Sequence, residues 1–261
     1  MGIIFDNVSF SYDENNLFNN FNIEIENNKI TGIIGKSGSG KSTFLELIAG
    51  LIKPDKGKVL INNFEINRRD IGFIYQNPED SFFNIYVKDE LLFALKNYNM
   101  NENRIYDALK LVGLKEEILN KKLNELSSGE KRLIAILSVI VYNPKIILFD
   151  EPTNNLDYKN KKKIISLIKN LKNKYDKTIV IVSHDVDLLY ELCDNLVVIS
   201  SGKLILYGDP ISVYNEMDLI KKYDISIPKV VEFEYLVRKK NIKLLNSRTI
   251  NDLIKEVYRN V

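Results

Sequence analysis

Hydrophobic residues near the start of the chain alternate with polar ones, which is the period of a half-buried β-strand. The segments 2–12 and 21–26 follow this alternation and are rich in β-branched and aromatic residues. Further strands are predicted at 29–35, 57–63 and 70–76. The first part of the chain is therefore expected to consist mainly of strands.

Apolar residues with helical spacing occur at 42–51 and then dominate from about 85 to 142. The first helix is expected to stop at Gly50, because Pro54 follows shortly after it. The longer region predicts a helical subdomain over about residues 85–142.

Two later strands, at 145–152 and 178–183, are apolar on both faces, and a helix is predicted between them at 158–175. Strands of this kind are typical of a central parallel sheet that is covered by helices. A hairpin follows over 195–208, with Gly202 in its turn. The pattern therefore predicts an α/β fold.

Two more helices are predicted after about residue 224. The first has Pro228 near its first turn, and the second has Ser247 as its candidate N-cap. We therefore expect a main domain of 1–224 and a small helical C-terminal region of 225–261.

The composition narrows the possible partners. The 37 Lys and Arg residues against 35 Asp and Glu residues leave a net charge of +2, so no nucleic-acid partner is predicted. The single cysteine, Cys193, excludes an intrachain disulfide and is expected to be a small buried apolar group. The apolar run 133–142 is shorter than the roughly 18 residues that span a bilayer. We expect a soluble, cytoplasmic chain that meets a membrane only through partners.

The segment GKSGSGKS at 35–42 fits the phosphate-loop pattern and lies between a predicted strand and a predicted helix. Glycines let the backbone N–H groups point at phosphate oxygens, and the helix adds its positive N-terminal end. Lys41 is predicted to reach the β- and γ-phosphates, and the Ser42 hydroxyl to bind Mg²⁺. The predicted nucleotide-binding residues here are Gly35, Lys36, Ser37, Gly38, Ser39, Gly40, Lys41, Ser42 and Thr43.

The run IILFDE at 146–151 supplies the acidic partner of this loop. Asp150 emerges at the carboxyl end of a buried strand, where ligands of open α/β sheets bind, and is predicted to hold Mg²⁺ through water. Glu151 points differently, and our hypothesis is that it is the general base for the attacking water. The alternative is that Glu151 is an ordinary surface glutamate.

The segment LSSGEKR at 126–132 resembles the L-S-G-G-Q signature of ATP-binding cassette (ABC) ATPases. Tyr12 matches the aromatic residue that stacks on adenine in that family, and Gln76 matches its Q-loop glutamine. The segment 153–157 occupies the position of the D-loop, and His184 matches the switch histidine. The resemblance covers about residues 2–215.

The resemblance implies a P-loop NTPase fold. Its parts would be a central, mostly parallel sheet, an antiparallel β subdomain, a helical signature subdomain and the small helical C-terminal appendage. It also implies an ATP hydrolase whose catalytic residues are Glu151, His184 and Gln76, and whose Mg²⁺ ligands are Ser42, Gln76 and Asp150. Two such chains would pair head to tail and clamp two ATP molecules. The residues that would face the partner's ATP are Ser127, Ser128, Gly129, Glu130 and Asp157.

Two residues of the signature segment depart from the family pattern, and both concern its contact with the partner's ATP. Ser128 replaces the first signature glycine, and Glu130 replaces the glutamine. In the D-loop, Asn154 and Asn155 replace smaller residues, so only Asp157 is carried over.

Three looser segments resemble the energy-coupling factor (ECF) transporter ATPases: 75–83, 207–214 and 225–242. This implies an importer of vitamins or transition-metal ions that is driven by ATP-dependent closure and opening of an ATPase dimer. The partners would be an identical or related ATPase chain, a transmembrane coupling protein and a substrate-binding membrane protein at the cytoplasmic face of the cell membrane. Glu79 and Asp80 are candidate contacts for basic residues of the coupling protein.

The residues leave other functional interpretations open. A conventional ABC importer or exporter ATPase is one alternative, because only the three looser segments oppose it. A soluble ABC ATPase that acts on ribosomes or DNA is disfavoured, because the chain has neither a second cassette nor a strong basic patch. A module that closes on ATP without hydrolysis is disfavoured by the presence of Glu151 and His184.

Overall fold

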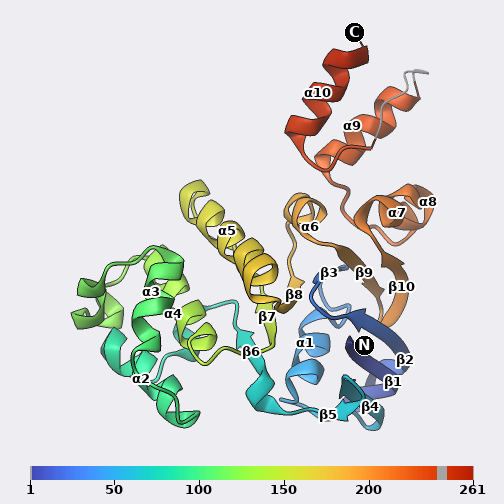
Figure 1. Cartoon of the computed structure of the whole chain (residues 1–261). Coiled ribbons are helices and arrows are strands. Elements are labelled where there is room, and N and C mark those ends of the chain that lie inside the picture. The colour runs from blue at the N-terminus through green and yellow to red at the C-terminus, as the bar shows by residue number, and fades with distance from the viewer. Residues whose placement is uncertain (1, 240–245, 261) are drawn as a thin grey trace.

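The computed structural model describes residues 2–239 and 246–260, which form two sheets with surrounding helices (Figure 1). Of the predicted C-terminal region 225–261, residues 240–245 and 261 lie outside the described residues. In the described ranges, no helix has both the length and the apolar character that crossing a membrane requires.

The central sheet has six strands, and in spatial order they are β10 (Lys203–Gly208), β9 (Asn195–Ser200), β3 (Ile30–Ile34), β8 (Thr178–Val182), β7 (Ile146–Asp150) and β6 (Ile71–Ile74). Neighbouring strands are parallel except β9 and β10, which form the predicted hairpin. Strands β3 and β8 are buried along their whole length, as expected of strands that are apolar on both faces. The predicted α/β fold with a mostly parallel sheet is confirmed.

A second, antiparallel sheet contains, in spatial order, β2 (Asn15–Glu26), β1 (Gly2–Tyr12), β4 (Lys56–Ile61) and β5 (Phe64–Glu65). Strand β2 begins earlier than the predicted 21–26, because its pairing with β1 continues to the hairpin pair of Tyr12 and Asn15. Its extra residues are mostly polar and exposed, so they lack the apolar alternation on which the prediction depended.

Helix α1 (Lys41–Ala49) packs between the two sheets. The ring of Phe44 stacks on Phe5 at 4.3 Å and meets Phe21 edge-on at 5.8 Å. The helix ends, as predicted, at Gly50, whose φ of 65° lies in the left-handed region that favours glycine. Buried apolar contacts therefore fix the helix whose first turn carries the phosphate loop.

The predicted helical region 85–142 contains α2 (Val87–Asn97), α3 (Arg104–Val112) and α4 (Ser128–Ile140). Figure 1 shows these helices grouped on one side of the molecule, away from the antiparallel sheet. Helix α5 (Tyr158–Tyr175) buries one apolar stripe against the same core as the helical group. The predicted helix at 158–175 is confirmed.

The last part of the chain contains α6 (Val186–Leu192), α7 (Pro210–Asn215), α8 (Met217–Lys222), α9 (Lys229–Arg238) and α10 (Ile250–Asn260). Helices α9 and α10 form a pair that projects from the α6 end of the core (Figure 1) and has a small apolar cluster of its own.

The prediction that Ser247 caps the second of these helices is wrong. The Thr249 hydroxyl accepts a hydrogen bond from the Asp252 backbone N–H at 3.1 Å, and it donates one to the Asp252 carboxylate at 2.7 Å. Because α10 begins at Ile250, the capping side chain must come from the residue just before it. The Ser247 N–H instead donates to the Glu234 carboxylate at 2.7 Å.

Candidate nucleotide-binding site

Four segments that are distant in sequence meet at the carboxyl edge of the central sheet. Asp150 at the end of β7 pairs with Val182 at the end of β8, and Val182 also pairs with Ile33 of β3. Strand β6 ends beside β7, with Ile74 opposite Phe149. The phosphate loop, the two acidic residues, His184 and Gln76 therefore all follow strands at one edge, where open α/β sheets bind ligands.

The phosphate loop has the backbone that its glycines allow. Gly38 and Gly40 have φ values of 76° and 104°, and a Cβ on Gly40 would lie 2.9 Å from the Phe18 ring. The Lys41 ammonium donates hydrogen bonds to the carbonyls of Gly35 and Lys36, both at 2.9 Å. The loop thus curls around the ammonium group, as a phosphate cradle requires.

Lys41 has only 6% of its surface exposed. Burial lowers the pKa of its ammonium group, and the carboxylates of Glu151 and Asp150 oppose this shift. An anionic ligand would supply the negative charge that this desolvated cation lacks. The hydroxyl of Ser39 is also buried and has no hydrogen-bond partner among the described residues.

Asp150 and Ser42 provide oxygen atoms that fit a Mg²⁺ ion. Burial raises the pKa of the Asp150 carboxyl, and the nearby Ser42 hydroxyl opposes the rise. Within residues 2–239 and 246–260, no group of three His, Cys, Asp or Glu side chains could hold a metal. A Mg²⁺ ion here would therefore depend on phosphate and water oxygens as well as on the chain, which is its usual habit in NTPases.

Glu151 is 7% exposed and has a left-handed backbone with φ of 49°. Its carboxylate accepts hydrogen bonds from the Ser183 hydroxyl at 3.1 Å and from the His184 N–H at 2.8 Å. Burial raises the pKa of this carboxyl, and His184 is the largest opposing influence. Ser183 was not predicted, although a polar residue directly after an apolar strand was a usable signal.

The His184 side chain is 61% exposed, and its Nε2 atom lies 3.8 Å from Oε1 of Glu151. The imidazole therefore sits beside the candidate base while still facing outward. The structure brings His184, Glu151 and Asp150 together at one edge, as predicted from the strands that precede them.

Gln76 lies in the exposed segment that follows β6, and the signature helix α4 is attached beside it. The buried guanidinium of Arg132 donates to the Tyr75 carbonyl at 2.9 Å, and Lys131 forms an ion pair with Glu79. Glu79 therefore has a cationic partner within the chain. Arg132 was missed because its carbonyl partner lies 57 residues away in sequence.

Tyr12 lies at the end of β1, beside the first turns of α1. Its hydroxyl donates to the Glu46 carboxylate at 3.0 Å and lies 3.3 Å from the Thr43 hydroxyl. The ring packs edge-on against Phe10 at 4.8 Å and remains 47% exposed. An aromatic face is thus available next to the phosphate loop.

The signature residues form the N-terminus of α4. The Ser127 hydroxyl and N–H donate to the Glu130 carboxylate at 2.8 and 2.9 Å, and the Glu130 N–H donates back to the hydroxyl at 3.3 Å. Hydrogen bonds from Ser127 hold the pKa of Glu130 below its usual range. Ser128 is exposed at the first helical position. Glu130, the departure from the family pattern, is therefore part of a capping box.

The D-loop residue Asp157 caps α5 by accepting from the N–H and the side-chain amide of Asn160, at 2.9 and 2.6 Å. The same Asn160 side chain packs against Gly129, where an added Cβ would lie 2.4 Å from its amide nitrogen. The signature and the D-loop thus touch through Asn160, which the sequence did not indicate.

Comparison with known proteins shows the family to which this chain belongs. Residues 18–154 match the ABC transporter family. The ECF transporter ATP-binding protein EcfA2 of Caldanaerobacter subterraneus subsp. tengcongensis is 34% identical, and the match covers 94% of this chain and 92% of that protein. The chain belongs to the ABC transporter family, among its ECF ATP-binding proteins.

Other relatives agree with this assignment. This ABC ATPase is 32% identical to EcfA2 of Mycoplasma capricolum subsp. capricolum over 98% of the chain and 97% of the relative. It is 33% identical to EcfA3 of Oenococcus oeni over 99% of the chain and 97% of the relative.

Solved structures confirm the predicted P-loop NTPase fold. The cbiO1 protein of Clostridium perfringens, part of the ABC transporter complex cbiONQ, superposes with a TM-score of 0.75 at 30% identity. That match covers 89% of this chain and 98% of cbiO1. A dimeric ATP-binding cassette in a post-hydrolysis state, bound to ADP and phosphate, gives a TM-score of 0.71 at 30% identity over 80% of this chain and 98% of the cassette.

Proposed function

We propose that this chain is the ATP-binding and ATP-hydrolysing subunit of an ECF importer for vitamins or transition-metal ions. The observation that carries the proposal is the convergence of the phosphate loop, Asp150, Glu151 and His184 at one sheet edge. The names of the relatives, which are ECF transporter ATP-binding proteins, support the transport role.

ATP would bind with its phosphates in the loop 35–43 and its adenine on the face of Tyr12. The Lys41 ammonium, already enclosed by two loop carbonyls, would turn to the β- and γ-phosphates. Mg²⁺ held by Ser42, Asp150 and Gln76 would neutralise charge on those phosphates. Binding would exchange the neutral carbonyl acceptors of Lys41 for anionic phosphate oxygens, so both partners of the new hydrogen bonds would be charged.

Hydrolysis requires a base that takes a proton from the attacking water. Glu151 suits this role because its buried carboxyl has a raised pKa, which brings it closer to the operating pH. The Ser183 hydroxyl and the His184 N–H would hold that carboxylate in place. The exposed imidazole of His184 would contact the γ-phosphate and help to place the water.

The signature would act on the ATP of a second ATPase chain, identical or related. Ser127, Ser128, Gly129 and Glu130 occupy the start of α4, whose 13 residues direct a positive dipole outward. Asp157 would lie beside them through its contact with Asn160. The phosphate would have to compete with Glu130 for the proton of the Ser127 hydroxyl.

We further propose that residues 1–224 are the ATP-binding domain and that the region 225–261 helps to hold two ATPase chains together. Large apolar side chains on α9 and α10 are exposed in this chain, as expected of a surface that a partner covers. They are Phe233, Leu236, Ile250, Ile254 and Tyr258.

A second apolar surface follows the Q-loop and would receive the transmembrane coupling protein at the cytoplasmic face of the membrane. Phe83 is 77% exposed, and its ring lies 5.7 Å from that of Phe93. Ile85 and Tyr86 are exposed beside them in sequence. Of the two acidic candidates for this contact, Asp80 is exposed, whereas Glu79 already pairs with Lys131.

Membrane assembly tests this proposal. Tagged chain would be purified from detergent-solubilised membranes of its source, and the co-purifying proteins would be identified by mass. We expect a transmembrane coupling protein with the unmodified chain, and its loss with Phe83→Asp. Phe64→Asp is the matched control, because Phe64 is 75% exposed on β5 in the antiparallel sheet. Recovery of conventional importer or exporter subunits, or of no membrane protein, would contradict the ECF role.

A further inference from the structure

Helix α6 starts directly after the switch region. Asp185, the residue after His184, caps it by accepting from the Leu188 N–H at 2.9 Å, and the helix is only seven residues long. Lys161 of α5 forms an ion pair with Asp185. Because the helix is short and capped, a shift of its far end changes the position of the segment that carries His184.

The far end of α6 contacts the C-terminal region as well as β3, to which Asp194 is hydrogen-bonded. Arg248, which precedes α10, donates from Nη2 to the carbonyl of Cys193 at 2.6 Å. Cys193 is the C-cap of the helix and is buried. Its carbonyl belongs to a helix end whose carbonyls lack intrahelical partners, and a cation is favourable there. The guanidinium also lies over the ring of Tyr190, 5.4 Å from the centroid.

A second hydrogen bond joins the C-terminal region to α6. The backbone N–H of Lys229, the first residue of α9, donates to the Asp187 carboxylate in the first turn of α6 at 2.7 Å. The helix pair α9–α10 is therefore attached near both ends of α6.

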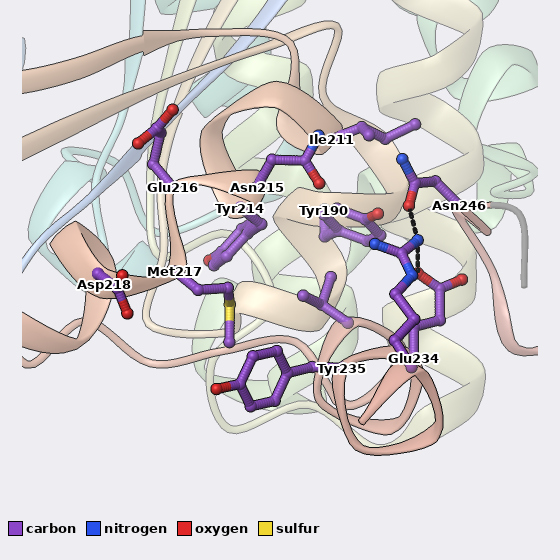
Figure 2. Close-up of a pocket in the computed structure, with 12 residues that line it drawn as sticks. Tyr190, Ile211, Tyr214, Asn215, Glu216, Met217, Asp218, Glu234, Tyr235 and Asn246 are labelled. Atoms are coloured by element: carbon purple, nitrogen blue, oxygen red, sulfur yellow. Dashed lines mark hydrogen bonds and ion pairs between the residues drawn. The ribbon is translucent and has the colours of Figure 1, made fainter. Parts of the chain in front are cut away.

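A cavity lies beside the contacts between α6 and the C-terminal region and reduces the apolar packing there. It has a volume of about 370 Å³ and lies where α9 faces α7 and α8 (Figure 2). Tyr190 and Tyr214 line one side, and Tyr235 and Glu234 line the other. Because this space interrupts apolar contact, directed hydrogen bonds contribute a larger share of the attachment.

From these contacts we infer that Arg248 is a positioning residue for His184. It fixes the end of α6, and through that helix it sets the place of the switch imidazole beside Glu151. Among the described residues its Nε atom is buried without a hydrogen-bond partner, so Nη2 provides the directed contact with α6. The inference rests on the proposed hydrolytic role of His184, and it makes the C-terminal region a contributor to turnover.

Steady-state ATPase kinetics on purified protein test the inference. Arg248→Ala is expected to lower kcat about tenfold and to leave the KM for ATP within about twofold, because His184 acts on the reaction and the phosphate loop binds ATP. Arg248→Lys keeps the charge and one donor, so it should recover part of the loss. The matched control is Arg259→Ala in α10, since Arg259 is exposed and pairs with Glu256 of its own helix.

The decisive comparison uses a His184→Ala background. If Arg248 acts through His184, adding Arg248→Ala should cause little further loss of kcat. A full additional tenfold loss would overturn the inference, and so would a normal kcat for Arg248→Ala. If Arg248→Ala fails to fold, Arg248→Lys is carried through the same cycle. An unmodified chain without ATPase activity would contradict the proposed function instead, so the two failures are distinguishable.

Discussion

The N-termini of α1 and α4, which we propose bind phosphate on the same chain and on a partner chain, are built differently. The start of α1 is enclosed: Lys41 is 6% exposed, and the carboxylates of Asp150 and Glu151 oppose the lowering of its pKa by burial. The start of α4 is open: Ser127 and Ser128 are exposed, and Ser127 bonds to Glu130 within a capping box. Among the described residues, the α4 start shares no hydrogen bond or ion pair with the phosphate loop.

The difference concerns which of the two sites has catalytic groups of its own. The α1 site combines a cation, two carboxylates and the loop backbone, so it has the groups to bind and to cleave a phosphate within one chain. The α4 site has donors and a dipole but no catalytic group. Under the proposed function it contributes when a second chain brings a nucleotide to it. Changes at the α1 site should then alter hydrolysis, and changes at the α4 site should alter dimerisation.

The largest effect should follow Glu151→Gln. We expect kcat to fall at least about 100-fold, since the base is removed, while ATP still binds. Burial raises the pKa of this carboxyl in the folded chain, so its ionised form at neutral pH costs stability, and that cost is absent below the unfolded pKa. The variant should therefore melt at a higher temperature near pH 7, with the difference shrinking as the pH falls through the raised pKa.

ATP turnover, nucleotide binding by calorimetry and melting curves at several pH values check this prediction. Unchanged turnover with nucleotide still bound would show that Glu151 is a buried structural residue and not the general base. A melting difference that grows on acidification would contradict the cited pKa direction.

A smaller effect is expected from Gly129→Ala. The new Cβ would meet the Asn160 side chain, which Asp157 holds in place, so the contact of the signature with the D-loop must shift. ATP-dependent dimerisation, measured by light scattering in the Glu151→Gln background, should weaken several-fold.

The double change of Gly129→Ala with Asn160→Ala frees this space and keeps the backbone N–H that bonds Asp157. Dimerisation should then recover. If dimerisation stays weak in the double variant, the clash between the new Cβ and the Asn160 side chain is not the cause.

The smallest effect should come from Glu130→Gln. Glu130 stays ionised because its pKa is lowered, and its charge lies beside the Ser127 hydroxyl that would face the partner's phosphate. Removing this partly exposed negative charge, which would repel the phosphate, should strengthen ATP-dependent dimerisation by about two- to fivefold at low salt, and by less at high salt. Weaker dimerisation, with no salt dependence, would mean that the capping role of the carboxylate matters more than its charge.

Much of the enclosed site could be predicted because its signals are local. The glycines of the phosphate loop, the apolar strands before Asp150 and His184, and the stop at Gly50 are each read within a few residues. Ser127 and Glu130 were also found, but their mutual capping was not, since the resemblance suggested only a phosphate contact. Arg132 and Arg248 were not predicted because their carbonyl partners lie 57 and 55 residues away.

The sequence by itself therefore determined the sheet, the phosphate loop and the edge at which the acidic residues and His184 emerge. The apolar periodicity that marks a strand or a helix extends over only a few residues. Neighbouring parallel strands then bring their carboxyl ends to the same edge of a sheet. Only the tertiary structure decided that Asn160 joins the signature to the D-loop and that Arg248 holds the helix behind His184. Those contacts depend on how whole helices pack, and one-dimensional patterns do not encode which side chain reaches which carbonyl.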